Sequence, residues 1–155
     1  MKKVVDQLIT RKETIATMES CTGGGVANAI TNIPGASEVL KFSAVTYSNE
    51  YKIKMGVNAN TIDTYSVYSM EVAREMSKQI SLFSNSTYGV GITGKIDRQD
   101  PNNLRGDVNT IFVSIYNSNT ENYETKKIEL PLLSRKECKE IIIEEIEKLL
   151  LSILK

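Results

Sequence analysis

Hydrophobic residues recur along this chain with two different spacings, which predict a mixture of helices and strands. Short runs rich in β-branched residues predict strands, and these runs are residues 14–18, 39–47, 88–93, 110–116 and 123–130. Apolar residues at helical spacing predict helices, and these cover residues 3–10, the segment from Gly23 to Pro34-Gly35, a helical turn at 50–55, the segment after Ser69 and the segment after Ser134. A strand-rich middle flanked by amphipathic helices indicates an α/β domain with helices on both faces of the sheet.

Polar residues and glycines sharpen this pattern. Ser69 is a favourable N-cap, and Ser134-Arg-Lys-Glu137 fits a capping box. The Asn/Ser-rich turn at residues 117–122 predicts that the last two strands pair as a hairpin, which makes the sheet mixed rather than all-parallel. The glycines of Tyr88-Gly-Val-Gly-Ile-Thr93 indicate close approach of another backbone or a ligand. The polar residues 95–108 predict a loop.

Composition excludes several classes of protein. The 155 residues suit one domain, and 41% hydrophobic residues can form a substantial core. The 19 basic and 19 acidic residues cancel without forming a basic block, so we expect no nucleic-acid partner and no membrane partner. The sequence shows no apolar run of membrane-span length, no signal peptide and only two cysteines, too few for a disulfide framework. A cytoplasmic location is therefore predicted.

The chain contains no histidine. This absence excludes Ser-His-Asp and Cys-His nucleophile systems as well as zinc sites built on histidine. Two cysteines cannot form a zinc site of their own either. Any catalysis must use serine, cysteine, lysine, tyrosine, arginine or carboxylate side chains.

The turn Glu19-Ser-Cys-Thr-Gly-Gly-Gly25 follows a predicted strand and precedes a predicted helix. Unpaired amides and the positive end of the dipole at a helix start favour anions, and glycines let them approach the backbone. Ser20 could therefore attack a carbonyl while nearby amides hold the developing charge. Alternatively, Ser20 or Thr22 merely caps the helix, which is the commoner use of such residues.

Two further side chains bear on this turn. Cys21 is a rival nucleophile because a thiol pKa can fall at a helix start, but without a histidine to pair with, a packing role is favoured. Without histidine, Ser20 would need another base, and Ala44-Val-Thr-Tyr-Ser-Asn-Glu-Tyr-Lys52 supplies Lys52, whose pKa would fall if it were buried. Tyr47 could relay a proton or orient the lysine. Alternatively, this stretch is a strand end followed by a solvated helix with an exposed Lys52.

One glycine-rich segment is misleading. Gly89-Val-Gly-Ile-Thr-Gly-Lys95 has the spacing of a phosphate-binding P-loop, but Ile96 stands where the magnesium-binding Ser or Thr belongs. The following residues do not resemble a helix start, so a nucleotide triphosphatase is not predicted.

Four segments in this order closely resemble the CinA C-terminal domain family, and they are Ala16-Thr-Met-Glu-Ser-Cys-Thr-Gly-Gly24, Ile33-Pro-Gly-Ala-Ser37, Val45-Thr-Tyr-Ser-Asn-Glu-Tyr-Lys52 and Gly56-Val57. These are the nicotinamide-nucleotide amidases, which hydrolyse nicotinamide mononucleotide to nicotinate mononucleotide and ammonia. The clear match covers about residues 14–57, and a weaker one continues to the final helix. The resemblance implies a single three-layer α/β/α domain with a mixed sheet, without metal or cofactor, in a stand-alone form and as a homodimer or other homo-oligomer.

The resemblance also implies roles for individual residues. Ser20 matches the nucleophile, Lys52 the base that activates it and Tyr47 their hydrogen-bonding assistant. The residues expected to contact the nucleotide substrate or its oxyanion are Thr22, Gly23, Gly24, Thr93, Gly94 and Arg135.

The sequence departs from the family pattern at two places. Lys95-Ile-Asp-Arg-Gln-Asp-Pro-Asn-Asn-Leu-Arg105 replaces a glycine-rich loop after Thr93-Gly94, and Leu133-Ser134 replaces a Gly-Asp pair before Arg135. Lys95, Arg98 or Arg105 could supply a phosphate contact from this loop, or the loop is simply solvated. Besides the pyridine mononucleotide amidase, two alternatives therefore stay open: a non-catalytic relative that binds a nucleotide or a protein, and an amidase for another substrate.

Overall fold

Five strands form one mixed sheet in the computed structural model, which describes residues 1–155. The strands are β1 (Ile15–Glu19), β2 (Leu40–Val45), β3 (Tyr88–Gly94), β4 (Thr110–Asn117) and β5 (Asn122–Glu129), in the order β2-β1-β3-β4-β5. β1 pairs in parallel with both β2 and β3, whereas β3–β4 and β4–β5 are antiparallel. The predicted mixed sheet and the predicted hairpin are therefore confirmed.

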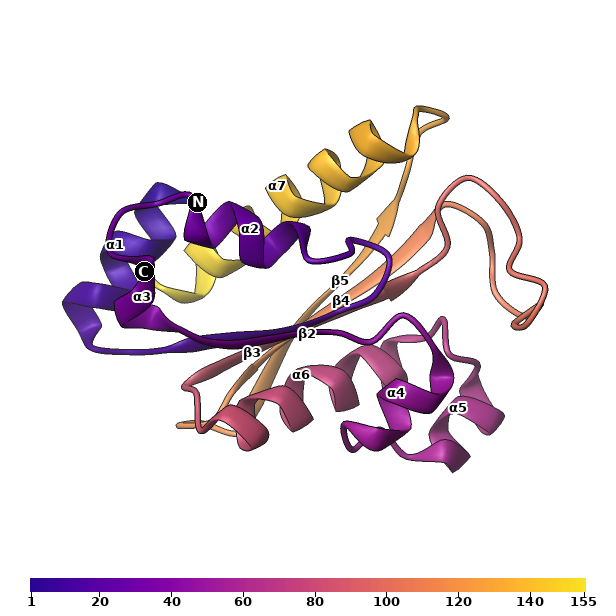
Figure 1. The fold of residues 1–155 in the computed structure, drawn as a ribbon, viewed down its shortest axis with the longest axis horizontal. Coiled ribbons are helices and arrows are strands. Elements are labelled where there is room, and N and C mark those ends of the chain that lie inside the picture. Colours follow the sequence, from indigo (N-terminus) through magenta and orange to yellow (C-terminus); the bar gives the residue numbers. More distant parts are fainter.

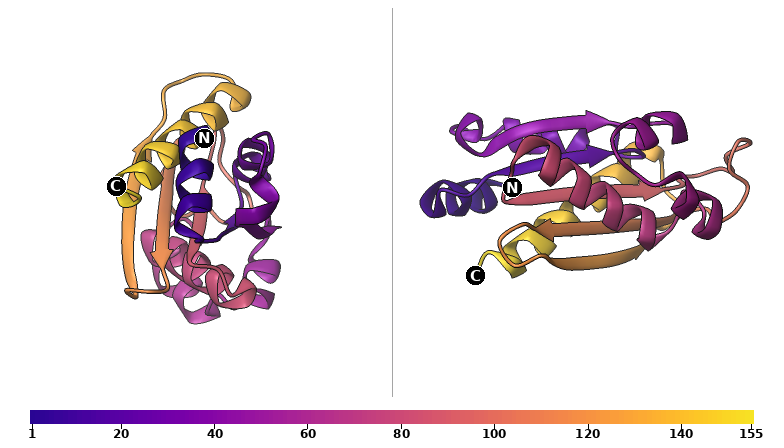
Figure 2. Two further views of the ribbon diagram at one scale, coloured as in Figure 1. Left: turned by 90° about the vertical axis from the view of Figure 1, so that its left-hand side faces the viewer. Right: turned by 90° about the horizontal axis from the view of Figure 1, so that it is seen from below.

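Helices cover both faces of this sheet, as Figures 1 and 2 show. On one face lie α1 (Lys2–Arg11), α2 (Gly25–Thr31), α3 (Ala36–Val39) and α7 (Arg135–Ile153). On the other lie α4 (Asn49–Lys54), α5 (Ala59–Tyr65) and α6 (Met70–Ser84). The three-layer α/β/α architecture is confirmed, and so are the N-cap at Ser69 and the capping box at Ser134.

The helices differ from the sequence prediction in three places. α2 begins at Gly25 rather than Gly23, because Gly23 (φ 61°) and Gly24 (φ 91°) adopt left-handed backbone conformations that an α-helix cannot contain. α3 and α5 were not predicted at all. α3 has only four residues, and α5 is mostly polar with only Ile62 buried, so neither shows the apolar periodicity that identifies longer helices.

The glycines of β3 allow α6 to lie directly on the sheet. A Cβ atom at Gly89 would stand 1.9 Å from the carbonyl oxygen of Ser77, and one at Gly91 would stand 2.3 Å from that of Ala73. The predicted close approach of another backbone is thus confirmed, and the approaching backbone is that of α6.

The core has two parts, one on each side of the sheet. The larger packs α1, α2 and α7 against the strands, and the smaller packs α5 and α6 against β1. Because β2, β1 and β3 are parallel, their carboxyl ends meet at the same edge. Ser20, Thr46 and Lys95 directly follow these three strands, so the fold brings three distant segments together there.

Candidate active site

The side chains of Ser20 and Lys52 meet at this edge. Lys52 lies on α4, whose start is capped by the Ser48 hydroxyl, and its side chain is only 2% exposed. Its Nζ donates hydrogen bonds to Ser20 Oγ at 3.1 Å and to the Thr46 carbonyl at 2.6 Å. The interpretation of Lys52 as a solvated surface residue is therefore wrong.

Burial changes the acid–base behaviour of Lys52. Removal from water disfavours the ammonium and lowers its pKa to about 8, and the charge interactions with Cys21 and Asp100 oppose this shift only in part. An amine with such a pKa is neutral in an appreciable fraction of molecules near neutral pH. A neutral Lys52 can accept the proton of the hydroxyl that it contacts, which is the requirement for activating a serine without histidine.

The turn that carries Ser20 is organised by a buried carboxylate. Glu19 is fully buried and accepts hydrogen bonds from the hydroxyls of Thr17 and Thr22 and from the amides of Val26 and Ala27. Those two amides belong to the first turn of α2, where an external anion would otherwise bind. Glu19 thus acts as an internal cap, and the expected anion site at the first turn of this helix is already filled.

Other amides of the same turn are free. The N–H groups of Gly23 and Gly25 bond to the carbonyls of Ser20 and Thr22, whereas those of Cys21, Thr22 and Gly24 donate no backbone hydrogen bond. The amide directly after Ser20 is thus available to stabilise negative charge on a group bound to Ser20 Oγ.

Cys21 does not have the properties of a nucleophile. Burial raises the pKa of its thiol to about 12, and nearby Lys52 lowers it only in part. A thiol with that pKa stays protonated at neutral pH, and only the thiolate attacks. The packing interpretation is the one that the structure supports, since the side chain belongs to the larger core.

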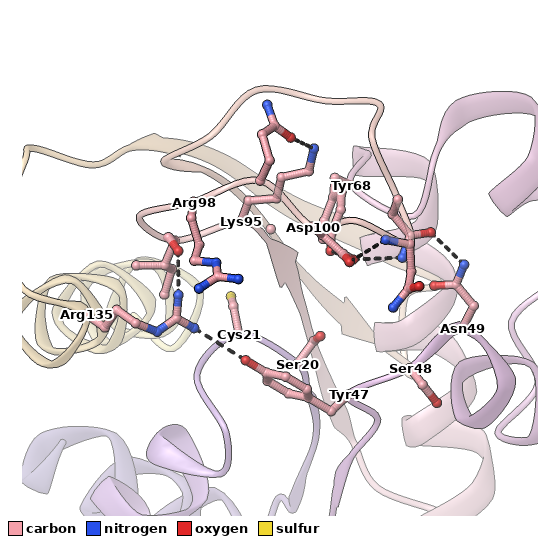
Figure 3. A pocket seen from close by; sticks show the side chains of 15 residues that line it. Ser20, Cys21, Tyr47, Ser48, Asn49, Tyr68, Lys95, Arg98, Asp100 and Arg135 are labelled. Carbon is pink, nitrogen blue, oxygen red and sulfur yellow. Dashed lines mark hydrogen bonds between the residues drawn. The ribbon is translucent and has the colours of Figure 1, made fainter.

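A cavity of about 680 Å³ opens in front of Ser20. Figure 3 shows its lining, in which Ser20 lies between two arginines on one side and a group of amide and carboxylate side chains on the other. The residues that line it come from the turn after β1, the segment after β2, the segment before α6, the end of β3 with the loop that follows it, and the start of α7. Its size suits a small-molecule ligand.

Tyr47 and Arg135 meet across the mouth of this cavity. Tyr47 is 63% exposed, and its hydroxyl accepts a hydrogen bond from Arg135 Nη2 at 3.3 Å. Arg135 Nη1 donates to the carbonyl of Ile96. Tyr47 makes no hydrogen bond to Ser20 or Lys52, so its partner is an arginine of α7 rather than the serine–lysine pair that the sequence suggested.

The loop at residues 95–108 has a defined structure, anchored from within and from outside. The buried ammonium of Lys95 donates to Gln99 Oε1 at 2.6 Å and to the carbonyls of Leu104 at 3.2 Å and Gly106 at 2.9 Å. Asp100 accepts a 2.5 Å hydrogen bond from the Tyr68 hydroxyl. The P-loop interpretation fails here as well, because β3 runs into this loop rather than into a helix, and Lys95 serves its own loop.

The predicted site residues fall into two groups. Those that line the cavity are Ser20, Tyr47, Gly94 and Arg135, with Lys52 directly behind Ser20. Those that do not line it are Thr22, Gly23, Gly24 and Thr93. The hydroxyl of Thr22 bonds to Glu19 and that of Thr93 to the Val67 carbonyl, so both hold the backbone together beside the cavity.

Some important residues were missed by the sequence analysis. Glu19 was noted only as part of its motif, although a carboxylate just before a glycine-rich helix start was a usable signal for an internal cap. Asp100 and Asn103 also line the cavity, and no spacing in the sequence distinguishes them from solvated loop residues.

The fold and this site define a class: α/β proteins in which a serine after a central strand pairs with a buried lysine. Comparison with known proteins gives the family. The model of the CinA C-terminal domain matches residues 1–154, and the chain belongs to that family.

Curated relatives match only part of the chain. A CinA-like protein of Desulforapulum autotrophicum is 44% identical over 88 residues, which are 56% of this chain and 21% of that protein. A CinA-like protein of Endomicrobium trichonymphae is also 44% identical over 88 residues, again 56% of this chain and 21% of its own length. The matched region thus spans about a fifth of the length of these curated relatives.

Solved structures match almost the whole chain. The competence/damage inducible protein CihA of Agrobacterium tumefaciens superposes with a TM-score of 0.87 at 24% identity, covering 99% of this chain and 95% of that one. A CinA superfamily protein of Klebsiella pneumoniae 700603 gives 0.90 at 22% identity, covering 99% and 94%. At these identities the comparison establishes the fold alone. In this chain itself, every helix is too short or too polar to cross a membrane.

Proposed function

We propose that this protein is a serine–lysine amidase that hydrolyses nicotinamide mononucleotide to nicotinate mononucleotide and ammonia. One observation carries the proposal: Lys52 Nζ lies 3.1 Å from Ser20 Oγ, behind the wall of a cavity that can hold a small molecule. Burial lowers the pKa of Lys52 to about 8, which gives the pair a base in a chain without histidine. Family membership supports the nucleotide as substrate.

The proposed reaction has two halves. Neutral Lys52 takes the proton of Ser20 Oγ, which attacks the carboxamide carbon, and the carbonyl oxygen becomes an oxyanion facing the free amide of Cys21. The Lys52 ammonium then gives this proton to the departing nitrogen, the C–N bond breaks, and ammonia leaves a Ser20 ester. Water attacks the ester with Lys52 again as base, which releases the carboxylic acid and restores the Ser20 hydroxyl.

An ammonia-release assay tests this proposal. Purified protein incubated with nicotinamide mononucleotide should release ammonia and nicotinate mononucleotide in equal amounts, and Ser20→Ala should remove the activity. Cys21→Ala is the matched control, because it alters the neighbouring side chain without removing the proposed nucleophile. A folded wild-type protein that releases no ammonia would rule the proposal out for this substrate.

A non-catalytic relative that binds a nucleotide or a protein is the main alternative. Its support is the contact between Tyr47 and Arg135, because the tyrosine that should assist the pair bonds elsewhere. This alternative expects nicotinamide mononucleotide to bind without turnover. If turnover occurs with other amides only, the protein is an amidase for a different substrate, which a panel of small carboxamides would identify.

A further inference from the structure

Two guanidinium groups face the candidate cavity without a carboxylate partner. Figure 3 shows Arg98 reaching into the space between Arg135 and Cys21, and its guanidinium has no hydrogen-bonding partner there. Arg135 donates two hydrogen bonds, to the Ile96 carbonyl and to the Tyr47 hydroxyl, and neither acceptor is charged. An arginine has five N–H donors, so both side chains keep donors for a ligand.

The backbone fixes the two arginines beside each other. The carbonyl of Ile96 accepts hydrogen bonds from the amide of Arg98 at 2.9 Å and from the guanidinium of Arg135. One oxygen atom thus joins the loop that carries Arg98 to the helix that carries Arg135. Like charges held close repel each other, and an anion bound between them relieves that repulsion.

The loop on both sides of Arg98 is held in place. The amide of Asp97 donates to Asn109 Oδ1 at 2.8 Å, and Asp100 is tied to Tyr68. Lys95 draws the two ends of the loop together through the Leu104 and Gly106 carbonyls. The base of the Arg98 side chain is therefore positioned, while its guanidinium stays free.

The other two cationic side chains of the loop that carries Arg98 are already used. Lys95 is buried among oxygen atoms of its own loop, and Arg105 donates to the carbonyls of Asp63 and Thr64, each at 2.7 Å. The first amides of α2 are occupied by Glu19. Of the charged residues that line the cavity, Asp100 offsets Lys95, which leaves the two arginines as its excess charge.

We infer that Arg98 and Arg135 form a subsite for the phosphate monoester of the substrate and that Arg98 determines the preference for a nucleotide over a nucleoside. Two planar guanidinium groups suit the several oxygens of a phosphate, to which each can donate two hydrogen bonds. The identity of the ligand as a nicotinamide nucleotide rests on the proposed function. The binding of its anionic group rests on the two arginines alone. Of the three basic residues in this loop, only Arg98 is assigned to ligand binding, because Lys95 and Arg105 donate hydrogen bonds that hold the loop in place.

Calorimetry on proteins carrying Ser20→Ala tests the inference, because turnover cannot then disturb binding. Adding Arg98→Ala should raise the Kd for nicotinamide mononucleotide about 10- to 100-fold, the usual effect of losing charged hydrogen bonds. The Kd for nicotinamide riboside, which lacks the phosphate, should change by no more than about twofold. Inorganic phosphate should compete with the nucleotide in the parent protein and compete less well after Arg98→Ala.

Lys136→Ala is the matched control, since it removes one exposed positive charge next to Arg135 without altering the cavity lining. It should leave both Kd values unchanged at physiological salt. The inference is overturned if Arg98→Ala weakens nucleotide and nucleoside equally, weakens neither, or if the parent protein binds no phosphate-bearing ligand. If the wild type releases no ammonia but binds the nucleotide in a way that depends on Arg98, the subsite is supported and the proposed function is lost. If Arg98→Ala leaves ammonia release unaffected, the proposed function stands and the subsite is lost.

Discussion

Lys52 Nζ and Ser20 Oγ lie 3.1 Å apart, although 31 residues separate them along the chain and the lysine is almost completely buried. The only other hydrogen bond of this amine goes to the Thr46 carbonyl, so no carboxylate contacts it directly. A buried amine with two neutral acceptors destabilises the folded protein. Such a cost is typical of functional sites, where chemistry rather than stability decides the residue.

Replacing Lys52 by methionine should separate activity from stability. Lys52→Met keeps the length of the side chain but removes the base, so kcat should fall by about 10²- to 10⁴-fold. The free energy of unfolding at pH 7 should stay equal or rise, because the buried amine no longer has to be desolvated. Ammonia release and denaturant unfolding measure the two quantities. A variant that loses activity because it unfolds would contradict this assignment.

The activity should depend on pH through Lys52. Because burial lowers its pKa to about 8 and the neutral amine is the active form, kcat/KM should rise with pH to a plateau above about 8. At pH 7, roughly a tenth of the molecules would carry the neutral amine. A kcat/KM that is flat between pH 6 and 9 would show that another group is the base.

The same pKa shift makes a prediction about stability. Lys52 titrates near pH 8 in the folded state and near its ordinary value of 10.5 in the unfolded chain. Between these values the unfolded chain binds more protons, so the stability of the folded protein rises with pH across this window, in total by roughly 3 kcal/mol. Denaturant unfolding at a series of pH values measures this slope, and its difference from Lys52→Met isolates the lysine. An identical slope in both proteins would contradict the shifted pKa.

Cys21 should be unreactive although it adjoins Ser20. Since burial raises its thiol pKa to about 12, iodoacetamide at pH 8 should modify the native protein far more slowly than the unfolded one. Cys21→Ala should keep kcat within about tenfold, because the side chain packs in the core and a cavity is the main consequence. Mass spectrometry of alkylated peptides gives the first result. Fast modification accompanied by loss of activity would instead make Cys21 the nucleophile.

Tyr47→Phe tests the partner of this hydroxyl. Because the hydroxyl bonds to Arg135 rather than to Ser20 or Lys52, its removal should raise KM and leave kcat nearly unchanged. A KM increase of about three- to tenfold corresponds to one ordinary hydrogen bond. A large fall in kcat at unchanged KM would show that the tyrosine assists the serine–lysine pair after all.

The glycines of β3 should be intolerant of substitution. Gly91→Ala would place a Cβ 2.3 Å from the Ala73 carbonyl oxygen, so α6 would have to move and the protein should lose more than about 2 kcal/mol of stability. Gly25→Ala is the matched control, because its Cβ would meet only the end of the Ile143 side chain at 3.0 Å. Unfolding midpoints of the two variants give the comparison, and equal midpoints would contradict the close packing of α6 on β3.

Much of the fold could be predicted because local patterns and the tertiary structure agree. The long amphipathic helices, the β-branched strands and the hairpin all carry strong periodicity. α5 carries none, since it is a short polar helix with one buried side chain, and only its packing and the Asn58 cap identify it.

The sequence was sufficient to predict the pair Ser20 and Lys52, but not the side chains that surround this pair. Ser20 and Lys52 lie in recognisable segments, and the absence of histidine narrowed the choice of base. The polar loop at residues 95–108 gives no such signal. Whether a basic residue there is buried among carbonyls, like Lys95, or faces the cavity, like Arg98, depends on contacts between distant parts of the chain.

The internal cap formed by Glu19 has a consequence for protein engineering. All four donors to its carboxylate come from residues 17–27, so the shape of the turn that presents Ser20 is specified within one short segment. The side chains proposed to recognise the ligand lie on other segments. Replacing the loop between β3 and β4 by one of different sequence could therefore change the substrate specificity of the protein while the structure of the turn that carries Ser20 stays the same.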